Sequence, residues 1–167
     1  MTEITTNQGN TYRLVEIGNQ CWFADNLKEI PTNPGGWYGY YGNATEERNL
    51  GEGLLYTWKA AMNGEAEEGA RGTCPIGWHI PIECELRMVE NNLEFVPSSF
   101  PGRTTLDAEG EMQIKTSSFT GRGYLFYLWS STDAQDGPSV LWQVRRRSAS
   151  VINGNPKNTY SARCIRD

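Results

Sequence analysis

The stretch from Gly72 to Phe95, GTCPIGWHIPIECELRMVENNLEF, decides how the rest of the chain is organised. Its first ten residues include two prolines and two glycines. Because proline lacks the backbone donor that a helix interior needs, this half predicts a loop with a short extended segment. Ile76, Trp78 and Ile80 alternate there with smaller or polar residues, which predicts that one side of the segment is buried.

A helix is predicted from Glu83 onward, because the hydrophobic period changes there. Its apolar face is made of residues at helical spacing: Leu86, Val89, Leu93 and Val96. Glu83 and Glu85 lie in the first turn, where the helix dipole favours negative charge. Ile82 precedes them, and an apolar N-cap costs about 1 kcal/mol relative to Ser or Thr. We therefore expect packing to stabilise this end, or the helix to begin at another residue.

Five short sequence words carry a resemblance to a known family: GNQCWFADNL, LLYTWKAA, CPIGWHIP, YLWSSTD and ARCIRD. Together they resemble the Fibrobacter succinogenes major paralogous domain family over residues 9–167. That family looks like a branch of the C-type-lectin-like fold. The resemblance therefore implies one domain over residues 1–167, of class α+β and loop-rich, with a short antiparallel sheet and two helices. The family usually has Thr after the HIP word, where this chain has Ile82.

Further elements are predicted from local patterns. Residues 12–17 and 21–23 read as two strands around the turn Gly18-Asn19. Residues 54–62 read as a short helix. Three strands are expected at 124–129, 140–144 and 160–165, and they would form one antiparallel sheet.

The composition limits the classes of function. A net charge of −5 argues against a general nucleic-acid binder. No apolar run approaches the roughly 18–20 residues of a membrane span. The first residues are polar and have no signal-peptide core. The expected location is nevertheless extracellular, at a cell surface or on a virion.

The four cysteines leave two alternatives open. Cys21, Cys74, Cys84 and Cys164 could be reduced thiols, or they could pair in any of three ways. The resemblance favours a bridge between Cys74 and Cys164, because both lie in family words.

Catalysis and metal binding are not expected. The single histidine, His79, lies where packing explains it, and no catalytic partner is evident. The spacing of Cys74, His79 and Cys84 supplies three zinc ligands, whereas a closed structural site needs four. The stretch WSSTDAQDGP lacks the acidic word of calcium-binding lectins. We therefore predict no cofactor and no metal.

The stretch from 140 to 155 holds the strongest candidate for a binding surface. Val140, Trp142 and Val144 would point inward, while the residues between them point outward with three consecutive arginines. The predicted ligand-binding face consists of Arg122, Tyr124, Thr132, Asp133, Gln135, Asp136, Leu141, Gln143, Arg145 and Arg147. The alternative is a solvated strand with salt bridges to acidic loops.

An aromatic loop could contribute to that face through Trp37 and Tyr40. The alternative, which we favour, is that its rings attach the loop to the body of the domain.

The function predicted from the sequence is a non-catalytic binding or display module for a protein or glycan ligand. Its layout resembles variable proteins of diversity-generating retroelements, which vary residues near the C-terminus on a lectin-like frame. The alternatives are an enzyme similar to the formylglycine-generating type and a purely structural surface-protein domain. The enzyme would need a reactive cysteine pair near the C-terminus, where this chain has Cys164 alone.

Overall fold

The fold is taken from a computed structural model of the chain. It describes residues 2–43, 52–90, 103–105, 118–120, 125–132, 139–145 and 148–167. In these ranges every pairing between two named strands is antiparallel, and the strands form four sheets.

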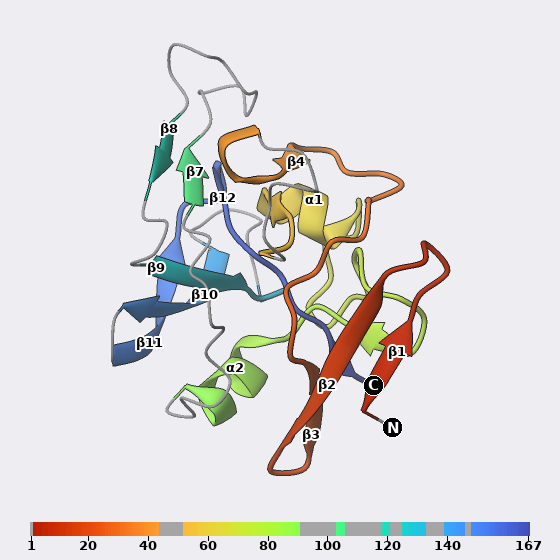
Figure 1. The fold of residues 1–167 in the computed structure, drawn as a ribbon. Helices are drawn as coiled ribbons and strands as arrows, with labels where there is room; N and C mark the ends of the chain where they lie inside the picture. The colour runs from red at the N-terminus through yellow and green to blue at the C-terminus, as the bar shows by residue number, and fades with distance from the viewer. Residues whose placement is uncertain are drawn as a thin grey trace.

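The largest sheet has five strands in the order β1-β2-β3-β13-β6. Their bounds are β1 Glu3–Thr5, β2 Thr11–Ile17, β3 Gln20–Phe23, β6 Trp78–His79 and β13 Ile165–Arg166. The predicted hairpin is confirmed, since β2 pairs with β3 across a turn in which Gly18 has a φ of +63°. The first and last strands of the chain thus share one sheet (Figure 1).

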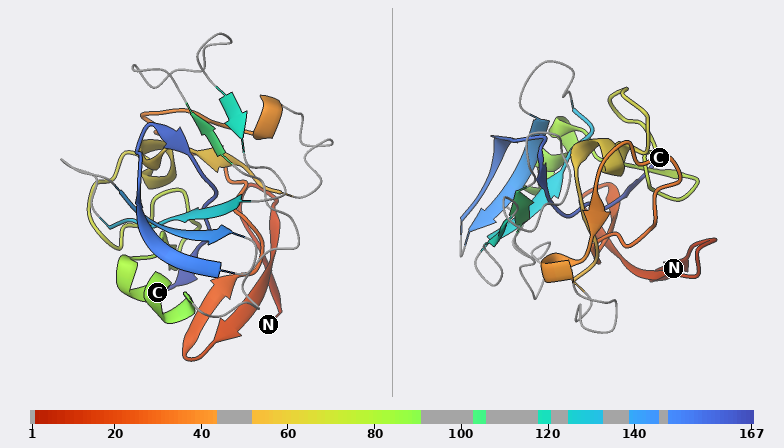
Figure 2. Two further views of the ribbon diagram at one scale, coloured as in Figure 1. Left: turned by 90° about the vertical axis from the view of Figure 1, so that its left-hand side faces the viewer. Right: turned by 90° about the horizontal axis from the view of Figure 1, so that it is seen from above.

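A second sheet of three strands is built from the C-terminal part of the chain, in the order β11-β10-β9. The bounds are β9 Leu125–Trp129, β10 Ser139–Arg145 and β11 Ser148–Gly154. Seen from above in Figure 2, this sheet and the N-terminal strands lie at opposite sides of the molecule. The prediction that residues 160–165 complete it is wrong, because β11 takes that place and Ile165 pairs in the first sheet.

The remaining elements are short. A two-stranded sheet joins β4 Tyr38–Gly39 to β5 Leu55–Tyr56, and a three-stranded sheet joins β12 Asn158–Thr159, β7 Arg103–Thr105 and β8 Ser118–Thr120. The helical elements are η1 Tyr41–Asn43, α1 Trp58–Met62 and α2 Glu83–Val89.

Both predicted helices are present, with different limits. Helix α1 begins four residues later than predicted, because Leu55 and Tyr56 pair with β4 and the hydroxyl of Thr57 then caps the helix by accepting the N–H of Ala60. Helix α2 begins at Glu83 as predicted, with Leu86 and Val89 buried. The rest of its predicted apolar face, Leu93 and Val96, lies outside the described residues.

The predicted α+β, C-type-lectin-like class is wrong. The described residues are mostly β, arranged as curled antiparallel sheets, and their two α-helices span only five and seven residues. The sequence predicted too much helix because Leu55 and Tyr56 are apolar enough to fit a helix face, but they form strand β5 instead. Within the described ranges, no helix is both long and apolar enough to cross a membrane.

Buried tryptophans connect segments that are far apart in the sequence. Trp22, Trp129 and Trp142 are completely buried, and Trp58 and Trp78 nearly so. A fully buried indole removes roughly 150–250 Å² from water, so a few of them can replace a large regular core.

Two of these indoles form a reciprocal pair of hydrogen bonds. Trp58 donates its indole N–H to the carbonyl of Ser130 at 3.0 Å, and Trp129 donates to the carbonyl of Tyr56 at 2.7 Å. Each bond spans more than 70 residues of sequence. The start of α1 is thereby fixed to the end of β9.

A disulfide between Cys74 and Cys164 closes a loop of 90 residues, as the resemblance favours. It attaches the segment before β6 to the segment before β13.

The burial expected around β6 is only partly found, since Ile76 is exposed at 80% while Trp78 and Ile80 are buried. Ile76 lies at the tip of a turn closed by the N–H of Trp78 on the carbonyl of Pro75, so the alternation begins only after it.

We predict that replacing Cys74 and Cys164 together by Ser lowers the free energy of unfolding by about 2–5 kcal/mol. The reason is that the unfolded chain loses a constraint over 90 residues. Urea denaturation with and without a reductant measures the effect. Cys21→Ser is the control, because Cys21 is a free thiol. A double variant as stable as the parent would contradict the prediction.

Candidate functional site

Along β10, the side chains of the predicted binding face change from buried to exposed. Leu141 is buried, Gln143 is half-buried and Arg145 is exposed. Strand register places Leu125 and Ser148 on either side of Arg145. The exposure expected for Arg145 is confirmed, and that expected for Leu141 is wrong.

Leu141 is buried because the β9–β11 sheet is covered on both faces at this end. On one face, Leu141 packs in a cluster with Trp129 and Tyr160. On the other face, Trp142 and Val144 pack with α2. The alternation of the sequence correctly separates the two faces, but it cannot say how far each is covered.

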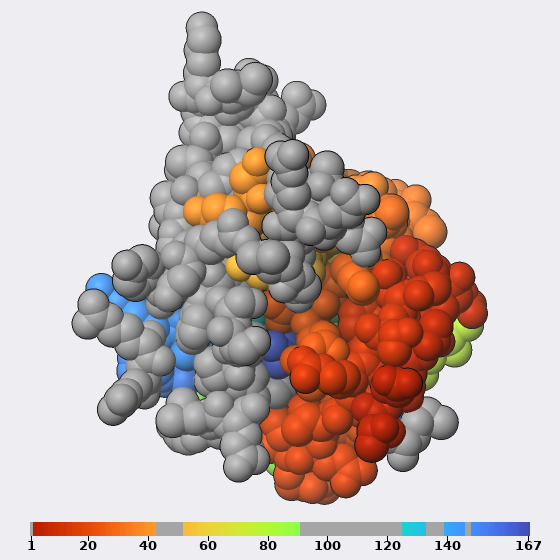
Figure 3. Space-filling model, in the orientation of Figure 1, coloured from red at the N-terminus to blue at the C-terminus, as the bar shows by residue number. Residues whose placement is uncertain are grey.

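The packing over the sheet ends near Gln143, which is half-buried, and Arg145, which is exposed. The Gln143 amide donates to the hydroxyl of Tyr127 at 3.1 Å, which fixes its position. The guanidinium of Arg145 makes no ion pair or hydrogen bond within the described part of the chain. In Figure 3, the β10–β11 hairpin reaches the surface on the side away from the N-terminal strands.

Thr132 has a structural task that the sequence did not reveal. Its hydroxyl accepts the N–H of Glu83 at 2.7 Å and donates to a carboxylate oxygen of Glu68 at 2.6 Å. Since Ile82 has no side-chain acceptor, Thr132 supplies the missing cap of α2 from 49 residues further along. Glu85 adds a second bond by accepting the N–H of Ile82 at 2.8 Å.

Trp37 and Tyr40 are half-buried, and Tyr40 packs against the main hydrophobic cluster. The carbonyl of Trp37 accepts both the N–H and the hydroxyl of Thr57, and its ring lies so close to Gly39 that a side chain there would clash. These contacts favour the attached loop over a separate ligand platform. Other predicted site residues lie outside the described ranges: Arg122, Tyr124, Asp133, Gln135, Asp136 and Arg147.

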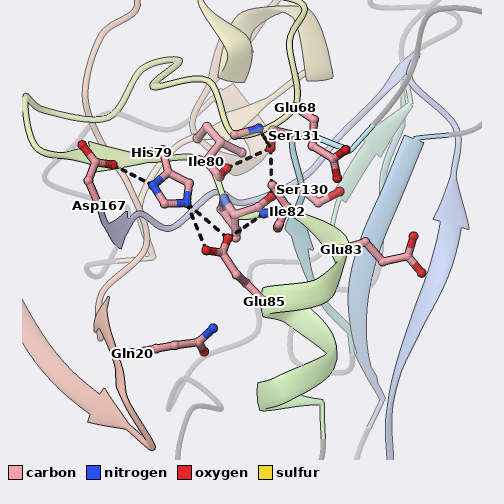
Figure 4. Close-up of polar contacts among 12 residues, drawn as sticks. Gln20, Glu68, His79, Ile80, Ile82, Glu83, Glu85, Ser130, Ser131 and Asp167 are labelled. Carbon is pink, nitrogen blue, oxygen red and sulfur yellow. Dashed lines mark hydrogen bonds and ion pairs between the residues drawn. The ribbon is translucent and has the colours of Figure 1, made fainter.

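A polar junction around His79 was also missed by sequence reasoning. Its Nδ1 lies 2.7 Å from a carboxylate oxygen of Asp167, and its Nε2 lies 3.2 Å from both oxygens of Glu85 (Figure 4). The hydrogen bond to Glu85 raises the pKa of His79, burial opposes that effect, and the bond to Asp167 adds to it. The ring therefore joins α2 to the end of β13.

The zinc alternative loses one of its ligands in the structure. Cys74 is bonded to Cys164, whereas Cys84 is an exposed thiol on α2. Over the described ranges, no three side chains among His, Cys, Asp and Glu lie together as a metal site would need.

The structure defines a mostly-β module, tied by a disulfide and buried indoles, with an exposed C-terminal hairpin. A family model described as the Fibrobacter succinogenes major domain matches residues 15–105, which is more than half of the chain. The chain therefore belongs to this family. Neither a curated protein nor a solved structure gives a match. The words YLWSSTD and ARCIRD lie beyond the matched range.

We predict that Thr132→Val destabilises the fold by about 1–2 kcal/mol, the usual cost of losing a helix cap. Valine keeps the shape of threonine but leaves the N–H of Glu83 without its acceptor. Thermal unfolding followed by circular dichroism measures the change. Thr11→Val is the control, because its hydroxyl bonds only to that of Thr5 at an exposed site. Equal losses for both variants would refute a capping role.

We also predict a pH dependence of stability from His79. Because the folded-state pKa is raised above its ordinary value of 6.5, folding is favoured most below that value. The contribution is lost as the pH rises through the folded-state pKa. Urea midpoints from about pH 5.5 to about pH 8.5 should fall for the parent chain and change less for His79→Gln. Parallel curves for the two proteins would show that His79 is not the group responsible.

Proposed function

We propose that this chain is a non-catalytic binding module that presents the β10–β11 hairpin to a protein or glycan ligand. The observation that carries the proposal is the gradient along β10. Leu141 lies in the core, whereas Arg145, four residues later on the same face, lies in solvent without an ion pair in the described part of the chain. One strand thus joins a rigid interior to an exposed charged end.

The rigidity of the frame supports this role. The disulfide from Cys74 to Cys164 and the indole bonds of Trp58 and Trp129 fix the segments around the hairpin. A surface that is already ordered loses less conformational entropy on binding than a mobile one. Substitutions at the exposed end of β10 and β11 would leave these contacts intact.

The residue types at that end also suit recognition. Arg145 and Ser148 are exposed, and Leu125 and Ser150 are half-buried beside them. Arginine is one of the residue types enriched in binding hot spots, and serine hydroxyls supply adaptable hydrogen bonds at recognition surfaces. Since the protein carries a net charge of −5, the arginines at 145–147 stand out as a local excess of positive charge.

Display outside the cell or on a particle is part of the proposal. The Cys74–Cys164 disulfide supports it, because disulfides persist mainly in oxidising surroundings. In its most specific form, the proposal is that the chain is a variable protein of a diversity-generating retroelement. Sequence variation would then be confined to the exposed end of the hairpin, and the buried tryptophans would stay constant.

The alternative of a formylglycine-generating type of enzyme is less well supported. That chemistry needs a reactive cysteine pair near the C-terminus, whereas Cys164 is here joined to Cys74 in a buried disulfide. A purely structural surface domain is the other alternative, and a binding experiment separates it from the proposal.

The test is to probe a glycan array and an array of cell-surface proteins with the purified domain. For any ligand found, we expect the double variant Arg145→Ser and Arg147→Ser to bind about tenfold or more weakly, with unchanged thermal stability. Lys157→Ser is the matched control, because it removes an exposed charge from the turn beyond the other end of the hairpin. Undiminished binding by the double variant would remove this face from the proposal.

A further inference from the structure

A hollow of about 460 Å³ adjoins strand β1, which lies away from the β10–β11 hairpin in Figure 2. Three segments form its walls: residues 4–8 around the end of β1, residues 29–32, and residues 71–78 around the disulfide. Its volume is within the range of small-molecule sites in proteins.

Glu29 is the unusual group in this hollow, because its side chain is ionisable and the residue is only 3% exposed. One carboxylate oxygen, Oε1, accepts hydrogen bonds from the hydroxyl of Thr6, the amide of Asn10 and the hydroxyl of Tyr12, all at 2.8–2.9 Å. These three donors are neutral, so they hold the carboxylate in place without cancelling its charge.

The second oxygen of Glu29, Oε2, accepts no hydrogen bond from the described residues, and Glu29 is among the residues that line the hollow. No described Lys or Arg forms an ion pair with this carboxylate. A nearly buried carboxylate is costly unless a cation or several donors satisfy it. The hollow therefore presents one fixed acceptor oxygen with a negative charge.

Most other polar groups around the hollow are already occupied. The amide of Gln8 bonds to the backbone N–H and carbonyl of Ile30, and the hydroxyl of Thr73 donates to the carbonyls of Ala60 and Ala61. The amide oxygen of Asn63 accepts the N–H of Asn33. A ligand thus meets few competing polar partners apart from Glu29.

Part of the lining of the hollow is apolar and exposed. Ile76 is 80% exposed and Ile30 is 55% exposed, two of the three large hydrophobic side chains exposed to this degree in the described part of the chain. Both line the hollow, together with Ile4 and Pro75. Such a lining can cover the methylene groups of a long side chain whose charged end reaches further in.

We propose that this hollow binds a primary alkylammonium group, such as the end of a lysine side chain of a partner protein. The ammonium would donate to Oε2 of Glu29 in a charge-assisted hydrogen bond, and the methylene stem would lie against Ile30 and Ile76. Arg71, an exposed cation that also lines the hollow, opposes the ligand's charge and keeps the affinity low. This site is separate from the β10–β11 face and does not depend on its proposed role.

The test uses two probes with the same four-carbon stem, of which only the first carries a terminal ammonium group: Nα-acetyl-lysine methylamide and Nα-acetyl-norleucine methylamide. Backbone amide shifts in NMR spectra report binding at each residue. We expect saturable shifts at Glu29 and residues 71–76 with the lysine probe, with a Kd in the range of about 1–10 mM. The norleucine probe should give none. Equal binding of both probes, or shifts confined to other surfaces, would overturn the proposal.

Two variants act in opposite directions on the lysine probe. Glu29→Gln keeps an acceptor for the three neutral donors but removes the charge, so binding should weaken about tenfold or more. Arg71→Ala removes the opposing cation, so binding should tighten severalfold, and its exposed position leaves folding intact. Glu16→Gln is the matched control for net charge, because Glu16 is exposed outside this hollow. If Glu29→Gln fails to fold, Arg71→Ala alone decides: unchanged or weaker binding refutes the site.

Discussion

The reciprocal hydrogen bonds of Trp58 and Trp129 are the interaction on which the other features depend. Each indole enters the core and satisfies its only polar atom on the backbone of the other segment. The arrangement buries two large rings and pairs both indole N–H groups. Each buried donor left unpaired would cost about 1–3 kcal/mol. It also fixes the end of β9. Ser131 and Thr132 come just after that end, so their hydroxyls are positioned by it.

Those two hydroxyls connect β9 to the stretch that organises the chain. Ser131 bonds to the carbonyls of Ile80 and Pro81, and Thr132 caps α2. The disulfide and the His79 junction then attach the same stretch to the last residues of the chain. A sequence rich in turns thus joins several short sheets into one interior through a few polar bonds between distant segments.

Because these bonds fix the interior, two separate surfaces of the molecule are left to which roles are proposed. The β10–β11 hairpin lies on one side of the molecule, and β1, which contributes to the hollow around Glu29, lies on the other (Figure 2). In both surfaces, uncharged side chains order the structure beside or around the charged group. Gln143 and Tyr127 order the strand that leads to Arg145, while three neutral donors hold Glu29.

The sequence by itself determined the local features: the β2–β3 hairpin with its Gly18 turn, the start of α2 at Glu83, and the family, whose words also favoured the disulfide. These follow from short-range periodicity, turn chemistry and residue identity. Only the tertiary structure decided that Thr132 caps α2, that Leu141 is buried, that the class is mostly β, and that Glu29 faces a hollow. Each of these depends on which distant segment packs against a residue, and local patterns do not carry that information.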